Sequence, residues 1–231
     1  MRVGAKTHIG QMRAVNEDAY LVQDSILAVA DGMGGHQAGE VASSVAVKTI
    51  AGWPFDPLEP EESLNQALTE ANEKVFHLAQ GDPNMVGMGT TLSVAWIASG
   101  QVYVAHIGDS RVYLFDHEGF QQVTQDHSVV GELLREGALT EAEALIHPHR
   151  NVLTRSLGTA PKVTFDIQKA PFQTGSGLLL CTDGLHSLVL AEEMEAIVRK
   201  HADPQIAAEE LINLANGRGG YDNITVLIAI I

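Results

Sequence analysis

The chain has 231 residues, of which 45% are hydrophobic and 19% charged, a composition typical of a globular protein with a sizeable core. Its 14 basic and 29 acidic residues give a net charge of −15, which disfavours nucleic acid and anionic membranes as partners. One cysteine, Cys181, excludes a disulfide framework and favours a reducing compartment. With neither a signal-peptide pattern nor an apolar run of membrane-spanning length, we expect a cytoplasmic protein.

Strands and helices are expected along the whole chain. A strand over ILAVAD (26–31) precedes a helix at about 39–52, and a proline-rich loop leads to a second helix at about 61–80. From Thr90 to Thr124, apolar segments separated by turns predict a β-meander. The remaining expected elements are short helical pieces in 128–150, strands at about 163–169 and 176–182, helices at about 191–201 and 204–216, and a last strand at 224–231.

Several of these strands are apolar on both faces, which predicts that each sheet is covered on both sides. Two antiparallel sheets packed together, with helices outside, satisfy that requirement. No linker, repeat or low-complexity segment suggests a boundary within the chain. We therefore expect one α+β domain over residues 1–231.

Aspartates stand at the edges of the predicted strands: Asp18, Asp31, Asp109, Asp183 and Asp222. A single aspartate beside glycine is an ordinary turn former. If these edges lie at one end of a sandwich, however, the five carboxylates converge, and they resist ionisation unless a cation lies between them. Carboxylates combined with a backbone carbonyl and water suit Mg²⁺ or Mn²⁺. The pattern therefore predicts a metal site.

Seven short blocks span almost the whole chain: RAVNED (13–18), DGMGGH (31–36), GTT (89–91), GDSR (108–111), NVLTRSLG (151–158), LLLCTDGL (178–185) and DNITV (222–226). In this order they resemble the protein phosphatase 2C family, the metal-dependent serine/threonine phosphatases, in its compact bacterial form. Thr182 departs from the serine usual in the family. The resemblance implies a four-layer α-β-β-α sandwich with a two-metal centre at one end, and it places a variable flap at about 128–150.

The resemblance also implies a role for each site residue. Asp31 would bridge two Mn²⁺ or Mg²⁺ ions, and the Gly32 carbonyl would bind one of them. In the same resemblance, Asp183 and Asp222 would hold the second ion, and Asp18 would bind metal directly or through a metal-bound water. Asp109 with Asp183 would form a weaker third site, and Arg13 would hold the substrate phosphate.

The chemistry of such a site follows from general principles. Two cations about 3.5–4 Å apart lower the pKa of a bridging water and neutralise phosphoryl charge. His36, which titrates near neutral pH, is expected to protonate the leaving alkoxide, the alternative being that it orients metal-bound water. The resemblance further implies that the substrates are proteins phosphorylated on serine or threonine in signal transduction, a serine/threonine kinase among them. We expect the protein to be a monomer.

Two other functions remain open from the sequence. A GDSL-type esterase would use Ser110 with Asp183 and His186, but the later G-x-N-D block of that family is absent and the other acids stay unexplained. A non-catalytic phosphoprotein-binding relative would typically lack a metal aspartate, whereas Asp31, Asp183 and Asp222 are all present. Metal-dependent turnover of p-nitrophenyl phosphate distinguishes the phosphatase from the non-catalytic relative. Hydrolysis of p-nitrophenyl acetate that survives chelation but stops with a serine-directed inhibitor would favour the esterase.

Overall fold

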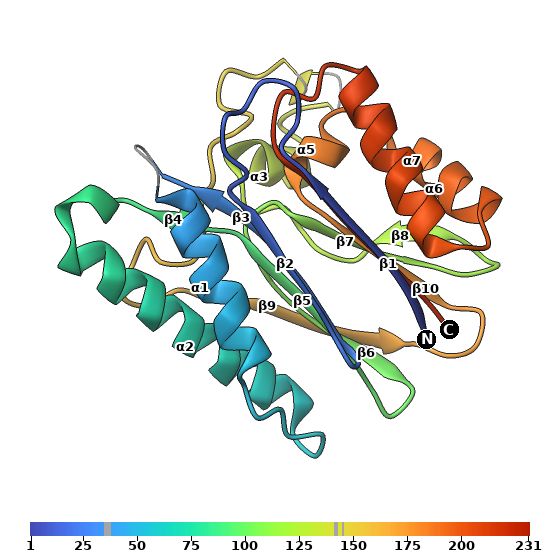
Figure 1. The fold of residues 1–231 in the computed structure, drawn as a ribbon, viewed down its shortest axis with the longest axis horizontal. Coiled ribbons are helices and arrows are strands. Elements are labelled where there is room, and N and C mark those ends of the chain that lie inside the picture. Colours follow the sequence, from blue (N-terminus) through green and yellow to red (C-terminus); the bar gives the residue numbers. More distant parts are fainter. Residues whose placement is uncertain (35–37, 141–142, 145) are drawn as a thin grey trace.

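The structure is a computed structural model that describes residues 1–34, 38–140, 143–144 and 146–231. Within them, the strands form two antiparallel sheets that pack face to face (Figure 1). The β11 sheet has the order β1 (Arg2–His8), β11 (Ile224–Ile230), β10 (Gly177–Cys181), β7 (Arg111–Phe115), β8 (Phe120–Gln122). The β3 sheet has the order β2 (Asp18–Gln23), β3 (Ile26–Met33), β5 (Leu92–Ala98), β6 (Gln101–Ile107), β9 (Asp166–Pro171), with β4 (Gly89–Thr90) paired to β3.

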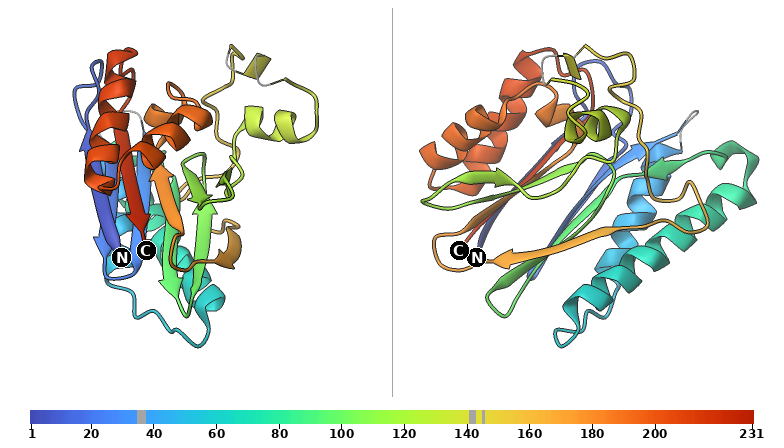
Figure 2. Two further views of the ribbon diagram at one scale, coloured as in Figure 1. Left: turned by 90° about the vertical axis from the view of Figure 1, so that its right-hand side faces the viewer. Right: turned by 180° about the vertical axis from the view of Figure 1, so that it is seen from behind.

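Long helices cover the outer face of each sheet (Figures 1 and 2). Helices α1 (Gly39–Ala51) and α2 (Pro60–Gly81) pack on the β3 sheet, and α6 (Ala191–Lys200) and α7 (Pro204–Gly217) pack on the β11 sheet. The remaining helices are short: η1 (Pro83–Met85), α3 (Val129–Arg135) and α5 (Asp183–His186). The predicted four-layer α+β sandwich is confirmed, and the four long helices end within two residues of the predicted positions.

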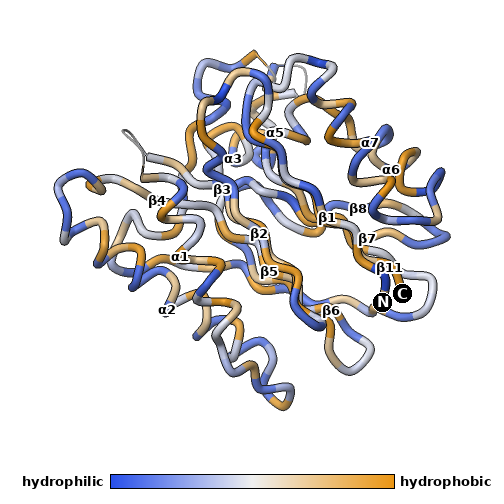
Figure 3. The backbone as a smooth tube through the Cα atoms, viewed as in Figure 1, coloured by the Kyte–Doolittle hydropathy of each residue, from blue (hydrophilic) through white to orange (hydrophobic). Residues whose placement is uncertain are grey.

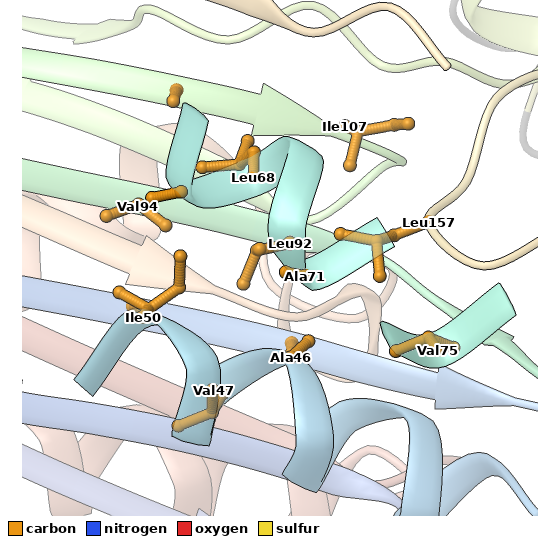
Figure 4. Close-up of a cluster of buried hydrophobic side chains, with 14 of the residues drawn as sticks. Ala46, Val47, Ile50, Leu68, Ala71, Val75, Leu92, Val94, Ile107 and Leu157 are labelled. Carbon is orange, nitrogen blue, oxygen red and sulfur yellow. The ribbon is translucent and has the colours of Figure 1, made fainter. Parts of the chain in front are cut away.

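The core forms as three apolar layers. Under α1 and α2, side chains such as Ile50, Leu68 and Leu92 are fully buried (Figure 4). Between the sheets, Leu27 of β3 faces Leu180 and Leu227 of the β11 sheet. Because a fully buried leucine or isoleucine contributes about 1.5–3 kcal/mol, these layers hold the sheets in place. Hydrophobic residues accordingly follow the central strands, while the connecting loops are largely hydrophilic (Figure 3).

The predicted meander over 90–124 is wrong. Strands β5 and β6 form a hairpin in the β3 sheet, but β7 pairs with β8 and β10 in the β11 sheet. The chain crosses between sheets at Gly108, whose φ of 107° favours glycine, and where a Cβ would lie 2.5 Å from Thr91 Cγ2. Turn residues mark where a strand ends but do not say which sheet the next one joins. This crossover places Asp109 at the junction of the two sheets.

Two smaller differences concern the strands. Strand β1, which pairs with β11 along its full length, was not predicted, because RVGAKTH carries charged residues and no apolar run. Strand β9 begins at Asp166 rather than 163. In the part of the chain that the structure describes, no helix combines the length and the hydropathy that crossing a membrane requires.

Candidate metal centre

A cavity of about 210 Å³ lies where the ends of the two sheets meet. Four of the predicted aspartates line it, each from a different connection of the fold: Asp31 from β3, Asp109 after β6, Asp183 after β10 and Asp222 before β11. Arg13 and Gly32 belong to the same wall. The sequence separates these residues by up to about two hundred positions, so the packing of the two sheets is what brings them together.

Asp18 lies behind this wall, directly opposite Asp31 in the β2–β3 ladder. Its Oδ2 accepts hydrogen bonds from the hydroxyls of Thr182, at 2.9 Å, and Thr225, at 2.6 Å. Its Oδ1 is buried and has no hydrogen-bond partner. The threonine at 182, which departs from the resemblance, therefore still supplies a hydroxyl donor to Asp18.

The carboxyl groups of the cluster resist ionisation. Burial, followed by repulsion from neighbouring carboxylates, raises the pKa of Asp109 to about 8 and that of Asp183 to about 6. Burial also raises the pKa of Asp18 to about 7, and the pKa of Asp31 lies well above its usual range for the same reasons. Added positive charge would therefore stabilise the ionised form of these carboxyl groups at neutral pH.

One cation of the protein already lies at the edge of the cluster. Arg13 Nη2 donates to Asp222 Oδ2 at 2.6 Å, and the Arg13 side chain is 49% exposed. An exposed guanidinium at the mouth of a cavity can contact a ligand oxygen while its other edge stays on a carboxylate. This position allows the contact with phosphate expected of Arg13, whose role stays a prediction.

Gly32 shows why glycine follows Asp31. A Cβ at this position would lie 2.1 Å from the carbonyl oxygen of Gly39, at the start of α1. The Gly32 amide donates to the Glu17 carbonyl at 3.1 Å. Glycine is therefore required for β3 to pass this close to α1 beside the cavity.

Glu17 is a cavity residue that the sequence analysis missed. Burial, followed by repulsion from Glu40, raises its pKa. Its amide donates to Asn223 Oδ1 at 2.8 Å, which ties the segment before β2 to the start of β11. The only signal for Glu17 in the sequence was its position next to Asp18. Asn151 and Leu153, from the NVLTRSLG block, line the same cavity.

His36, the predicted general acid, lies outside the described residues, so its role stays a prediction. Cys181 is fully buried in the core. The esterase alternative does not fit the geometry: Ser110 is buried and its hydroxyl shares a hydrogen bond with Thr91 Oγ1, whereas His186 Nε2 donates to the Asp109 carbonyl. Ser110 and His186 therefore make hydrogen bonds to other groups of the fold and not to each other.

The donor set fits a hard divalent cation. Asp18 Oδ1 and Asp183 Oδ1 are buried oxygens without partners, and carboxylate oxygen is what Mg²⁺ and Mn²⁺ prefer. Across residues 1–34, 38–140, 143–144 and 146–231, no three His, Cys, Asp or Glu side chains stand together in a ready-made metal site. Asp222 pairs instead with Arg13, and Asp18 with two threonines. Small side-chain movements would have to accompany binding.

Comparison with known proteins identifies the family of this chain. The family model described as "Protein phosphatase 2C" matches residues 6–213. The chain belongs to the protein phosphatase 2C family. It is 41% identical to the serine/threonine phosphatase stp of Listeria innocua, over 99% of this chain and 95% of that protein.

Solved structures of this family have the same fold. The crystal structure of the Mycobacterium tuberculosis serine/threonine phosphatase PstP is 35% identical, with a TM-score of 0.93 over 98% of this chain and 97% of that one. The catalytic domain of PstP in complex with two manganese ions is 34% identical, with a TM-score of 0.90 over 98% of this chain and 96% of that one. The membership predicted from the seven blocks is confirmed.

Proposed function

We propose that this protein hydrolyses phosphoserine and phosphothreonine in proteins and depends on Mn²⁺ or Mg²⁺ to do so. The observation that carries the proposal is the convergence of four aspartates from both sheets on one cavity with Arg13 at its edge. Family membership and the manganese ions of a relative with the same fold support it. A phosphoprotein substrate, with a serine/threonine kinase among the candidates, is consistent with the relatives that are named serine/threonine phosphatases.

The chain's own residues suggest how cations would be held. Asp31 would be shared between two ions, the Gly32 carbonyl would complete one site, and Asp183 with Asp222 would complete the other. Asp18 would contribute its free Oδ1, and Asp109 with Asp183 would make a third, weaker site. Once bound, the cations supply Lewis acidity, which lowers the pKa of water and neutralises charge on the phosphoryl oxygens.

Arg13 and His36 would act on the substrate itself. The Arg13 guanidinium would hold phosphoryl oxygens at the cavity mouth and keep the phosphorus atom in line for attack. The leaving serine or threonine alkoxide needs a proton, and His36 would donate it from the loop that follows Asp31. Glu17, on the same wall as Arg13, would accept a hydrogen bond from a water molecule in the cavity.

The test is turnover of p-nitrophenyl phosphate and of a phosphothreonine peptide with Mn²⁺, with Mg²⁺ and with EDTA. Activity should require the cation, and Asp31→Ala should abolish it while the protein stays folded by circular dichroism. Glu118→Ala, which removes an 81% exposed acid far from the cavity, is the matched control and should keep full activity. A folded Asp31→Ala protein with near-normal turnover would refute the proposal.

A further inference from the structure

Two histidines hold the turn that presents Asp109. On one side, the His127 amide donates to the Gly108 carbonyl at 2.7 Å, and the Gly108 amide donates to His127 Nδ1 at 3.1 Å. On the other side, His186 Nε2 donates to the Asp109 carbonyl at 3.0 Å. Peptide groups on both sides of the Gly108–Asp109 bond are therefore fixed by imidazoles.

The hydrogen bonds of His127 define its tautomer. Because Nδ1 accepts the Gly108 N–H, the ring proton must be on Nε2, which donates to Asp166 Oδ2 at 3.0 Å. Asp166 is held in turn by Arg155 Nη1 at 2.9 Å. The His127 side chain is completely buried, and burial lowers its pKa, which favours the neutral ring.

His127 also lies at the base of the segment that follows it. Its carbonyl accepts the Thr154 amide at 2.9 Å, and the next residue forms an isolated β-bridge with Leu153. Helix α3, which belongs to the segment between these contacts, stands out from one end of the sandwich (Figure 2). At its end lie Asn151 and Leu153, which line the same cavity as Asp109.

We propose that His127, with its tautomer set by Asp166, is a positioning residue that holds Asp109 and the base of the 128–154 segment in one fixed arrangement at the metal centre. The inference rests on the proposed function, because Asp109 is assigned there to the third cation site. His127 itself touches no reacting atom. It acts through the Gly108 peptide on one side and through the Thr154 amide on the other.

Two substitutions separate the two faces of the imidazole. In His127→Asn, the amide oxygen can take the place of Nδ1 and still accept the Gly108 N–H, but the contact with Asp166 is lost. In His127→Gln, the side-chain amide can reach Asp166 in place of Nε2, but nothing accepts the Gly108 N–H. Of the two variants, Asn should therefore be the conservative one at the metal centre.

The first measurement is Mn²⁺ binding, followed by isothermal titration calorimetry on the full chain, which does not depend on turnover. His127→Gln should weaken the site that Asp109→Asn also weakens, by roughly 10- to 100-fold, the usual range when a residue that orients a metal ligand is removed. His127→Asn should recover most of that loss. Ile212→Val, a mild core change in α7, controls for general destabilisation and should bind Mn²⁺ as wild type does.

The second measurement is a double-mutant cycle on Mn²⁺ affinity and on turnover. If His127 acts through Asp109, His127→Gln should add little to Asp109→Asn. Equal losses of Mn²⁺ affinity in His127→Asn and His127→Gln would overturn the inference. So would a double variant of His127→Gln and Asp109→Asn in which the two single losses multiply fully. If His127→Gln does not fold, His127→Leu replaces it, because leucine also accepts no hydrogen bond from the Gly108 N–H, and unchanged Mn²⁺ affinity in that variant would also overturn the inference.

These outcomes differ from those of the proposed function. A wild-type protein with no metal-dependent phosphatase activity would refute that function, whereas the Mn²⁺ titrations would still support or overturn the positioning role. An active wild type with His127 and Asp109 acting independently would leave the function standing and remove the role of His127.

Discussion

Replacing Asp183 by asparagine should stabilise the metal-free protein while removing its activity. Asp183 Oδ1 is buried without a partner, and burial followed by repulsion from Asp222 raises the pKa of Asp183 from 3.8 to about 6. At about 1.4 kcal/mol per pKa unit, this difference corresponds to about 3 kcal/mol by which ionised Asp183 disfavours folding. Because asparagine must bury an amide in place of the carboxyl group, we expect a gain of about 1–3 kcal/mol.

The pH dependence of this gain follows from the direction of the shift. Below about pH 4, Asp183 is protonated in both the folded and the unfolded protein, so the penalty is absent. Between about pH 4 and pH 6 the unfolded chain ionises first, and the stability of the wild type falls. Above about pH 6 the penalty is fully present. The advantage of Asp183→Asn should therefore grow over this window and stay constant at higher pH.

The assay is thermal unfolding in EDTA at pH 4.5 and pH 8, with Asp116→Asn in the β7–β8 turn as control. For a protein of this size, about 2–4 °C per kcal/mol gives a rise of about 2–12 °C at pH 8. The control should not rise, because backbone N–H groups already lower the pKa of Asp116. Saturating Mn²⁺ should offset most or all of this advantage, since a hundredfold excess over Kd adds about 2.7 kcal/mol to the wild type. An Asp183→Asn protein no more stable than wild type in EDTA at pH 8 would refute the reasoning.

Three further predictions test single features. In a urea titration, Gly108→Ala should lower the unfolding free energy more than Gly100→Ala. Both glycines have a positive φ, but only at position 108 would the added Cβ lie 2.5 Å from Thr91. Equal losses of unfolding free energy in the two variants would contradict this reasoning. Arg13→Ala should raise KM for a phosphothreonine peptide about tenfold or more if Arg13 holds phosphate, and an unchanged KM would remove that role. His36→Ala should slow dephosphorylation of the peptide by roughly 10²-fold and hydrolysis of p-nitrophenyl phosphate far less, because p-nitrophenolate leaves without a proton. Similar losses of rate on both substrates would instead favour a role for His36 in orienting metal-bound water.

The helices and the acidic positions could be predicted from the sequence because both signals are local. Helix α2 repeats apolar residues at helical spacing and buries Leu64, Leu68 and Val75, as the pattern requires. Asp31 lies near the end of β3 and Asp183 follows β10, and the residues that precede each of them are almost entirely apolar. That they line one cavity agrees with the predicted convergence, while the role of each as a ligand stays a prediction.

The parts that could not be predicted depend on contacts between distant segments. The glycine and aspartate between β6 and β7 indicate a turn, but they do not show that β7 pairs with β10 rather than with β6. His127 carried no signal, because its importance comes from Gly108 and from Asp166, 39 residues away. Glu17 gave only an acid beside another acid.

The sandwich explains how one protein can keep so many carboxyl groups together. Each aspartate of the cavity stands at the end of a strand that the apolar layers hold on both faces, so mutual repulsion cannot push the acids apart without separating the sheets. Asp18 shows the local part of this arrangement, since hydroxyls from β11 and from the end of β10 hold one of its oxygens and leave the other free. Ionised Asp109 and Asp183 are destabilised by burial and by their neighbours, as their raised pKa values show, and a bound divalent cation would remove this destabilisation. The same acids that destabilise the metal-free fold therefore give the site its affinity, and this is why we expect Asp183→Asn to separate stability from activity.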